Sequence, residues 1–251
     1  MAGRKYPRSS TIPAFSQIYN SPDFGTFLHN PQNFYTLPGW EGNDIVSPLV
    51  ARFDTPVQLV NDADAALLGE ALAGAARGAR VALMLTIGTG LGGAALIDGA
   101  ILRGAARDHP EIGHLIVDPA GPECYCGSRG CLESLVAGPA LARAGAAFGY
   151  ADAEAVFTAA EAGAEPARAI VDRSTEAMET AIWSLVHTLL PEVILIGGGI
   201  GERHFALYRE AAERAIGRAV LAPAGAIRVV KAALGNDAGM VGAAALMLDR
   251  A

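Results

Sequence analysis

Short apolar segments of strand length alternate with longer helical patterns from residue 57 onward. Strands are expected at 57–60, 81–87, 94–97, 193–196 and 227–230, and helices at 63–76, 139–148, 153–163, 166–190, 203–220 and 238–248. Strands separated by helices are typical of a sheet covered by helices. The pattern therefore predicts an α/β fold. No run approaches the roughly 18 consecutive apolar residues of a membrane span.

The first 45 residues have a different composition, with many Pro, Asn, Ser and aromatic residues and no sustained periodicity. We expect this part to be irregular. Its early basic residues are not followed by an apolar segment, so it does not match a secretory signal. We therefore expect a cytoplasmic protein. The formal net charge of −7 argues against a nucleic-acid partner, which needs a clustered basic surface.

All three cysteines of the chain lie within eight residues, at Cys124, Cys126 and Cys131, and His114 precedes them by ten. Three thiolates and one imidazole form a ligand set that zinc favours in closed, four-coordinate structural sites. The alternative is three free thiols near an unrelated histidine. The close clustering favours a structural zinc that fixes the loop.

Two carboxylates flank this cluster. Glu111 lies three residues before His114, and Glu133 lies two residues after Cys131. A metal site would hold both in a rigid frame, where they could accept hydrogen bonds from several sugar hydroxyls. The alternative is that both are solvated surface residues, and spacing alone does not decide between the two.

Two glycine-rich turns follow predicted strands. Gly88–Gly93 lies between two strands, whereas a dinucleotide-binding motif joins a strand to a helix, so that motif is excluded. Successive backbone N–H groups and the Thr89 hydroxyl could still bind a phosphate. Gly197–Gly199 ends another strand, where open α/β sheets place ligands. Tight hairpin or helix packing would explain either set of glycines equally well.

Asn61 and Asp62 stand between a predicted strand and a predicted helix. Both residue types are preferred as helix N-caps. A carboxylate at a strand end is also well placed to accept a proton from a substrate hydroxyl during phosphoryl transfer. These two roles are compatible, and spacing does not separate them.

Together these segments resemble the ROK family of sugar kinases and related repressors. The resemblance spans roughly residues 35–250, and the cysteine segment is its most specific part. The matching segments are Leu37–Trp40, Val60–Ala63, Gly69-Glu70, Gly88–Gly93, Asp98-Gly99, Arg103–Ala105, Glu111–His114, Cys124–Glu133, Gly197–Gly199 and Gly242–Ala244.

The resemblance implies an actin/hexokinase-like (ribonuclease H-like) ATPase fold, with a hexose and ATP–Mg²⁺ in the cleft between two lobes. It assigns the catalytic base to Asp62, sugar contacts to Asn61, Glu111, His114 and Glu133, nucleotide contacts to Gly88, Thr89, Gly90, Gly198 and Gly199, and structural zinc to His114, Cys124, Cys126 and Cys131. It also implies a homodimer.

One expected motif is missing. Kinases of the family begin with a strand and an Asp-x-Gly-Gly-Thr phosphate loop, and residues 1–60 contain no such sequence. We therefore expect residues 1–60 to be a remnant of the N-terminal lobe and the sugar-side loop. Residues 61–251 would form the main region and a complete C-terminal lobe, with the zinc-binding loop at 104–133. Such a chain should phosphorylate a glucose-, fructose- or hexosamine-like sugar weakly or not at all. The alternatives are a sugar-responsive transcriptional regulator and a non-catalytic sugar-binding protein.

Overall fold

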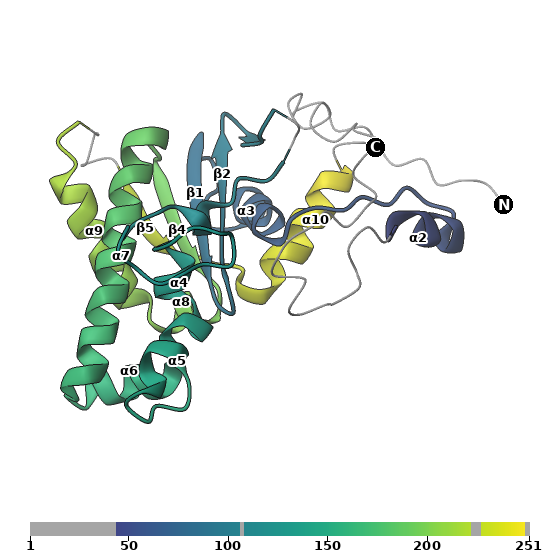
Figure 1. Cartoon of the computed structure of the whole chain (residues 1–251). Helices are drawn as coiled ribbons and strands as arrows, with labels where there is room; N and C mark the ends of the chain where they lie inside the picture. The colour runs from purple at the N-terminus through teal and green to yellow at the C-terminus, as the bar shows by residue number, and fades with distance from the viewer. Residues whose placement is uncertain (1–43, 106–107, 222–226, 249–251) are drawn as a thin grey trace.

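A mixed five-stranded sheet forms the centre of the molecule (Figure 1). The computed structural model describes residues 44–105, 108–221 and 227–248. The strands are β1 (Val81–Ile87), β2 (Leu91–Ile97), β3 (Ala100–Ile101), β4 (Val193–Gly197) and β5 (Arg228–Lys231). Their order is β3-β2-β1-β4-β5, in which β1, β2 and β3 are antiparallel neighbours and β4 and β5 run parallel to β1.

Helices cover both faces of this sheet. Helices α3 (Asp62–Ala73) and α10 (Ala238–Leu248) lie on one side, and α7 (Glu165–Leu189) and α9 (Phe205–Arg218) lie on the other (Figure 1). The remaining helices are α2 (Val46–Phe53), α4 (Glu133–Val136), α5 (Gly138–Ala146), α6 (Ala153–Glu161), α8 (Gly199–Arg203) and the 3₁₀ turns η3 (Ile112–His114) and η5 (Gly235–Asp237). Within the described residues, no helix combines the length and apolarity needed to cross a membrane.

The central strands are apolar throughout because both of their faces are covered. In β1, Leu83, Leu85 and Ile87 belong to the core beneath α7 and α9, whereas Ala82 and Met84 belong to the core beneath α3 and α10. Successive side chains of a strand point to opposite faces. A strand with helices on both sides therefore shows a continuous apolar run.

Helices α3 and α10 pack so closely that two glycines are required between them. A Cβ atom on Gly69 would lie 2.2 Å from the carbonyl oxygen of Ala238, and one on Gly242 would lie 1.7 Å from that of Ala65. No side chain fits at either distance. This packing fixes the position of α3, whose first turn carries Asp62.

Several predicted boundaries differ from the structure. The strand predicted at 57–60 is wrong, because this segment is extended but has no ladder partner among the described residues. The helix predicted at 203–220 is α9, which spans Phe205–Arg218, and the short helix α8 (Gly199–Arg203), which was not predicted, lies directly before it. Strand β2 begins at Leu91, before the predicted 94, and α3 ends at Ala73 rather than at 76. The predictions for residues 1–43, including Leu37–Trp40, lie outside the described residues.

Candidate functional site

At the start of α3, the helix N-cap and the exposed carboxylate are two different residues. The Asn61 side chain is the N-cap and accepts hydrogen bonds from the backbone N–H groups of Ala63 (2.9 Å) and Asp64 (3.3 Å). Asp62 is the first helical residue, and its side chain is exposed, with one oxygen 2.9 Å from the Ala63 nitrogen. Asn61 therefore provides the cap, and the Asp62 carboxylate faces solvent at the end of the helix.

A cavity of about 950 Å³ opens beside this helix end. It brings together predicted residues from five separate segments of the chain. Those that line it are Asn61, Asp62, Gly88, Thr89, Gly90, Glu111, Cys124, Glu133 and Gly198. The predicted residues His114, Cys126, Cys131 and Gly199 do not line it.

The first glycine turn is the tip of the β1–β2 hairpin, as predicted. The Gly88 N–H donates to the Gly90 carbonyl (2.9 Å), and the Gly88 carbonyl accepts from the Gly138 N–H at the start of α5 (2.9 Å). Thr89 is exposed at the tip. Gly198 follows β4 and caps α8 with a φ of 81°, a backbone conformation that favours glycine.

The two flanking carboxylates have different environments. Glu133 begins α4, is 8% exposed, and accepts a hydrogen bond from the backbone N–H of Leu91 at 2.8 Å. For Glu133, the alternative of a solvated surface residue is therefore wrong. Glu111 is exposed and precedes the turn η3. Because Leu91 follows the glycine turn, Glu133 connects that turn with the cysteine loop.

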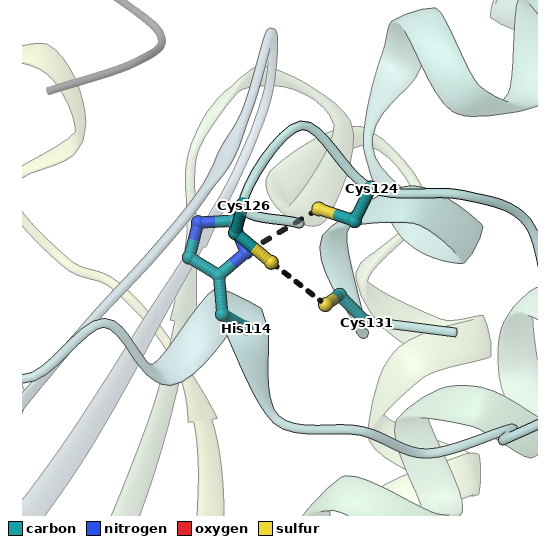
Figure 2. A group of neighbouring side chains, drawn as sticks. All are labelled: His114, Cys124, Cys126 and Cys131. Atoms are coloured by element: carbon teal, nitrogen blue, oxygen red, sulfur yellow. Dashed lines mark hydrogen bonds between the residues drawn. The ribbon is translucent and has the colours of Figure 1, made fainter. Parts of the chain in front are cut away.

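The four predicted metal ligands converge on one point (Figure 2). The His114 Nδ1 atom lies 3.5 Å from the Cys124 Sγ atom, and the sulfurs of Cys126 and Cys131 are 3.5 Å apart. One ligand atom from each of the four residues lies within 4.8 Å of all the others.

This geometry fits a zinc ion. Zinc–sulfur bonds of 2.3 Å in a tetrahedron separate the sulfurs by about 3.8 Å, close to the spacing of the thiols. Three thiols and one imidazole fill four positions, which leaves no open position for a substrate or water. His114, Cys124, Cys126 and Cys131 would therefore hold a structural zinc, with His114 using the Nδ1 atom that faces Cys124.

The thiols differ in how readily they lose their protons. Burial raises the pKa of Cys131 to about 12, and burial also raises the pKa of Cys124. For Cys126, burial acts to raise the pKa, but hydrogen bonds from the Ser128 backbone and from the neighbouring thiols outweigh it and lower the pKa. Zinc binds thiolates, so the buried thiols must release protons when the ion binds.

The backbone of the cysteine loop folds back on itself and so brings these ligands together. The Cys124 N–H donates to the Ser128 carbonyl at 2.9 Å, and Cys131 forms an isolated bridge with Ile116. Gly130 has a φ of 66°, and a Cβ atom there would lie 1.6 Å from the Asp118 carbonyl oxygen. Only glycine fits this position, immediately before a ligand.

The ROK family model matches residues 16–250, nearly the whole chain. The chain belongs to the ROK family. It is 35% identical over 231 residues to a glucokinase of Thermotoga maritima, which covers 85% of this chain and 73% of the relative. It is also 35% identical over 222 residues to an N-acetylmannosamine kinase of Citrobacter koseri, covering 86% of this chain and 72% of that relative.

The fold is that of the ROK hexokinases, as the resemblance predicted. A crystal structure of a ROK hexokinase from Thermus thermophilus superposes with a TM-score of 0.74 at 37% identity, covering 83% of this chain and 70% of the other. The actin/hexokinase-like class is therefore confirmed for this ROK chain.

The sequence did not single out two features of this ROK site. The first is Tyr125, which lines the cavity and places its hydroxyl oxygen 3.0 Å from the His114 Nε2 atom. Its position between two cysteine ligands was the available signal. The second is a group of three residues, Asp64, Arg103 and His109, that we call the buried triad. No spacing rule connects residues so far apart in the chain.

Proposed function

We propose that this ROK chain is an ATP-dependent hexose kinase. One observation carries the proposal: a single cavity is lined by an exposed carboxylate at a helix end, three further carboxylates (Glu111, Glu123 and Glu133) and two glycine turns. Hydroxyl-binding groups and phosphate-binding backbone are the two requirements of sugar phosphorylation. The relatives named as a glucokinase and an N-acetylmannosamine kinase support the same class of reaction.

Asp62 is the proposed general base. It accepts the proton of the reacting sugar hydroxyl as that oxygen attacks the γ-phosphorus of ATP, and the bond to the β,γ-bridging oxygen breaks. Asn61 caps the helix and so fixes the backbone that carries Asp62. Magnesium bound with ATP neutralises charge that develops on the phosphates.

The remaining residues orient the two substrates. Asn61, Glu111 and Glu133, which line the cavity, are proposed sugar contacts, and Gly88, Thr89, Gly90 and Gly198, which also line it, are proposed nucleotide contacts. His114 as a sugar contact and Gly199 as a nucleotide contact are proposed on the family resemblance alone, because neither lines the cavity. A carboxylate in a fixed frame accepts hydrogen bonds from hydroxyl groups without reorganising. The zinc held by His114 and the three cysteines is proposed to keep that frame rigid, with no part in the chemical step.

The substrate is proposed as a hexose of the glucose, fructose or hexosamine type. Two relatives with equal identity to this chain are named for different sugars, so identity does not choose among them. A homodimer is also proposed. Light scattering on the purified chain tests it, and a monomeric mass would contradict it.

Turnover by the 251-residue chain is expected to be slow. Residues 1–60, which we propose as the remnant of the first lobe, contain no Asp-x-Gly-Gly-Thr phosphate loop. Residues 61–251 are proposed to supply the sugar side and only part of the ATP side. Phosphoryl transfer depends almost entirely on positioning and electrostatics. An incomplete phosphate cradle should therefore reduce the rate much more than it reduces sugar binding.

The experiment measures sugar binding and phosphoryl transfer separately. The zinc-loaded chain is titrated calorimetrically with glucose, fructose and N-acetylmannosamine, and hexose phosphate formed from ATP–Mg²⁺ is quantified by mass spectrometry. Asp62→Asn is the matched variant, because it retains shape and removes only the base. We expect it to bind sugar as the unmodified chain does and to form product about 100-fold more slowly.

Each result has a distinct meaning. Binding of none of the three sugars would overturn the proposed sugar site. Turnover of about 1–100 s⁻¹, the ordinary range of kinases, would overturn the expected impairment. Sugar binding with no product, even from the unmodified chain, would instead favour a non-catalytic sugar-binding protein or the sugar-responsive regulator.

A further inference from the structure

The buried triad extends to the wall of the cavity, which His109 lines. Asp64 is completely buried in the first turn of α3, two residues beyond Asp62. One of its carboxylate oxygens forms an ion pair with Arg103, and the other lies 3.0 Å from the Nδ1 atom of His109. The Arg103 and His109 side chains are 9% and 14% exposed.

Arg103 alone accounts for the charge of Asp64. Burial of a carboxylate costs folding free energy unless a cation and hydrogen bonds compensate the charge. Arg103 supplies the cation for Asp64. The contact with His109 is therefore not needed to neutralise the buried carboxylate. Its physical effect is on the histidine, because a carboxylate beside one ring nitrogen holds the proton on that nitrogen.

The orientation of His109 leaves part of its ring at the cavity. His109 lines the same cavity as Asn61, Asp62 and Glu111, while its Nδ1 atom faces the buried Asp64. A neutral imidazole with its proton on Nδ1 has its acceptor lone pair on Nε2. Arg103 lies farther from the His109 Nδ1 atom, at 3.4 Å, than Asp64 does.

We propose that Asp64 holds His109 in the Nδ1-protonated tautomer, so that the His109 Nε2 atom accepts a hydrogen bond from a hydroxyl group of the hexose. His109 is then a further sugar-binding residue, and Asp64 is its positioning residue. This inference rests on the proposed function. It adds an acceptor on the wall beside the catalytic carboxylate, where the hydroxyl groups of the sugar must be distinguished.

The tautomer can be measured without any sugar. Long-range ¹H–¹⁵N correlation spectra of the ¹⁵N-histidine-labelled, zinc-loaded chain distinguish protonated from unprotonated ring nitrogens, and His109→Asn identifies the signal. We expect a protonated Nδ1 and an unprotonated Nε2. In Asp64→Asn, which removes the charge that selects the tautomer, we expect a mixture. A proton on Nε2 in the unmodified chain would overturn the proposal.

Sugar binding tests the second part of the proposal, which is the hydrogen bond from the hexose to the His109 Nε2 atom. In His109→Asn the side-chain amide can still donate to Asp64, but no acceptor remains at the position of Nε2. The buried contact is thus retained in a variant that lacks the proposed sugar contact. We expect a Kd for the hexose about threefold to tenfold higher, the effect of one hydrogen bond. Asp108→Asn, an exposed carboxylate beside His109, is the matched control and should bind as the unmodified chain does.

A purely structural role for His109 predicts a different result. His109→Asn would then bind glucose, fructose or N-acetylmannosamine as tightly as the unmodified chain, and the proposal would be wrong while the proposed function stood. If the unmodified chain binds none of these sugars, the proposed function fails and this inference fails with it. The thermal unfolding midpoint and zinc content of His109→Asn establish that it folds, so the test does not depend on Asp64→Asn alone.

Discussion

At the scale of single residues, neighbouring side chains at the start of α3 have different roles in the cavity. Asn61 accepts from the N–H groups of Ala63 and Asp64 at the start of α3, whereas the exposed Asp62 lines the cavity and also accepts from the Ala63 N–H. Two residues further along the helix, Asp64 points inward to Arg103 and His109. Three polar residues of one helix end, Asn61, Asp62 and Asp64, thus serve capping, proposed catalysis and the positioning of a cavity side chain.

The zinc ligands lead to a prediction about protons. The pKa of Cys124 and Cys131 is raised by burial, so both thiols are protonated at pH 7, and each must lose its proton before zinc can bind. We expect at least two protons to be released per zinc, and the apparent zinc affinity to fall as the pH is lowered. Calorimetric titrations in buffers with different ionisation enthalpies measure this release.

The pH dependence has a definite sign. A thiol with a raised pKa keeps its proton to higher pH, so protons compete with zinc more strongly at pH 6 than at pH 8. Binding heats that do not change between buffers would contradict the prediction.

Sequence alone predicted the cluster of candidate metal ligands, whose convergence the structure confirms, and it missed the buried triad. Both outcomes have the same physical reason. The three cysteines are close along the chain, so a short loop brings them together whatever the rest of the fold is. Asp64 and His109 are 45 residues apart and meet only because α3 packs against the segment after β3. Such contacts depend on tertiary packing, which local patterns do not encode.

At the scale of helices and strands, continuous apolar runs were sufficient to predict β1 and β4. The failures occurred where a local pattern had no tertiary partner. Residues 57–60 have the composition of a strand but pair with no strand among the described residues. By contrast, the helical pattern at 203–220 matches α9 (Phe205–Arg218) to within two residues at each end.

The contact between α3 and α10 gives a prediction at this scale. Gly242→Ala would place a Cβ atom 1.7 Å from the Ala65 carbonyl oxygen, so the two helices would have to separate. We expect the free energy of unfolding to fall by about 2 kcal/mol or more, a typical cost of overpacking. Urea unfolding followed by circular dichroism measures this change.

Gly239 of the same helix is the matched control. A Cβ atom at Gly239 would meet no described atom within 4 Å. Gly239→Ala should therefore be neutral, or stabilising by about 0.5–1 kcal/mol, since alanine favours a helix. Equal effects of the two substitutions would show that helix propensity, and not the α3–α10 contact, determines the result.

At the scale of the whole molecule, the cysteine loop is joined to both sides of the cavity. Glu133 follows Cys131 by two residues and binds the Leu91 N–H beside the glycine turn. The carbonyl of Gly88 in that turn accepts from Gly138, which begins the helix after α4. A change in the loop should therefore reach the proposed sugar and nucleotide contacts together.

Cys126→Ser tests this connection at a residue that does not itself line the cavity. Loss of one thiolate should release the zinc, and the loop that carries Glu133 would lose its main restraint. We expect less than one zinc per chain by mass spectrometry and a hexose Kd raised about tenfold or more.

The control for Cys126→Ser lies in the same loop. Arg129→Gln removes the ion pair with Glu123, a cavity-lining residue that is not among the proposed sugar contacts. Both side chains are exposed, and exposed pairs of this kind contribute little to stability. It should retain both zinc and hexose binding. If Cys126→Ser lost its zinc and still bound the hexose as tightly as Arg129→Gln, the zinc would stabilise the loop without positioning the sugar site. Because Cys126 is outside the cavity, a loss of affinity in Cys126→Ser alone must instead be transmitted through the loop, by way of Glu133 and its hydrogen bond to Leu91.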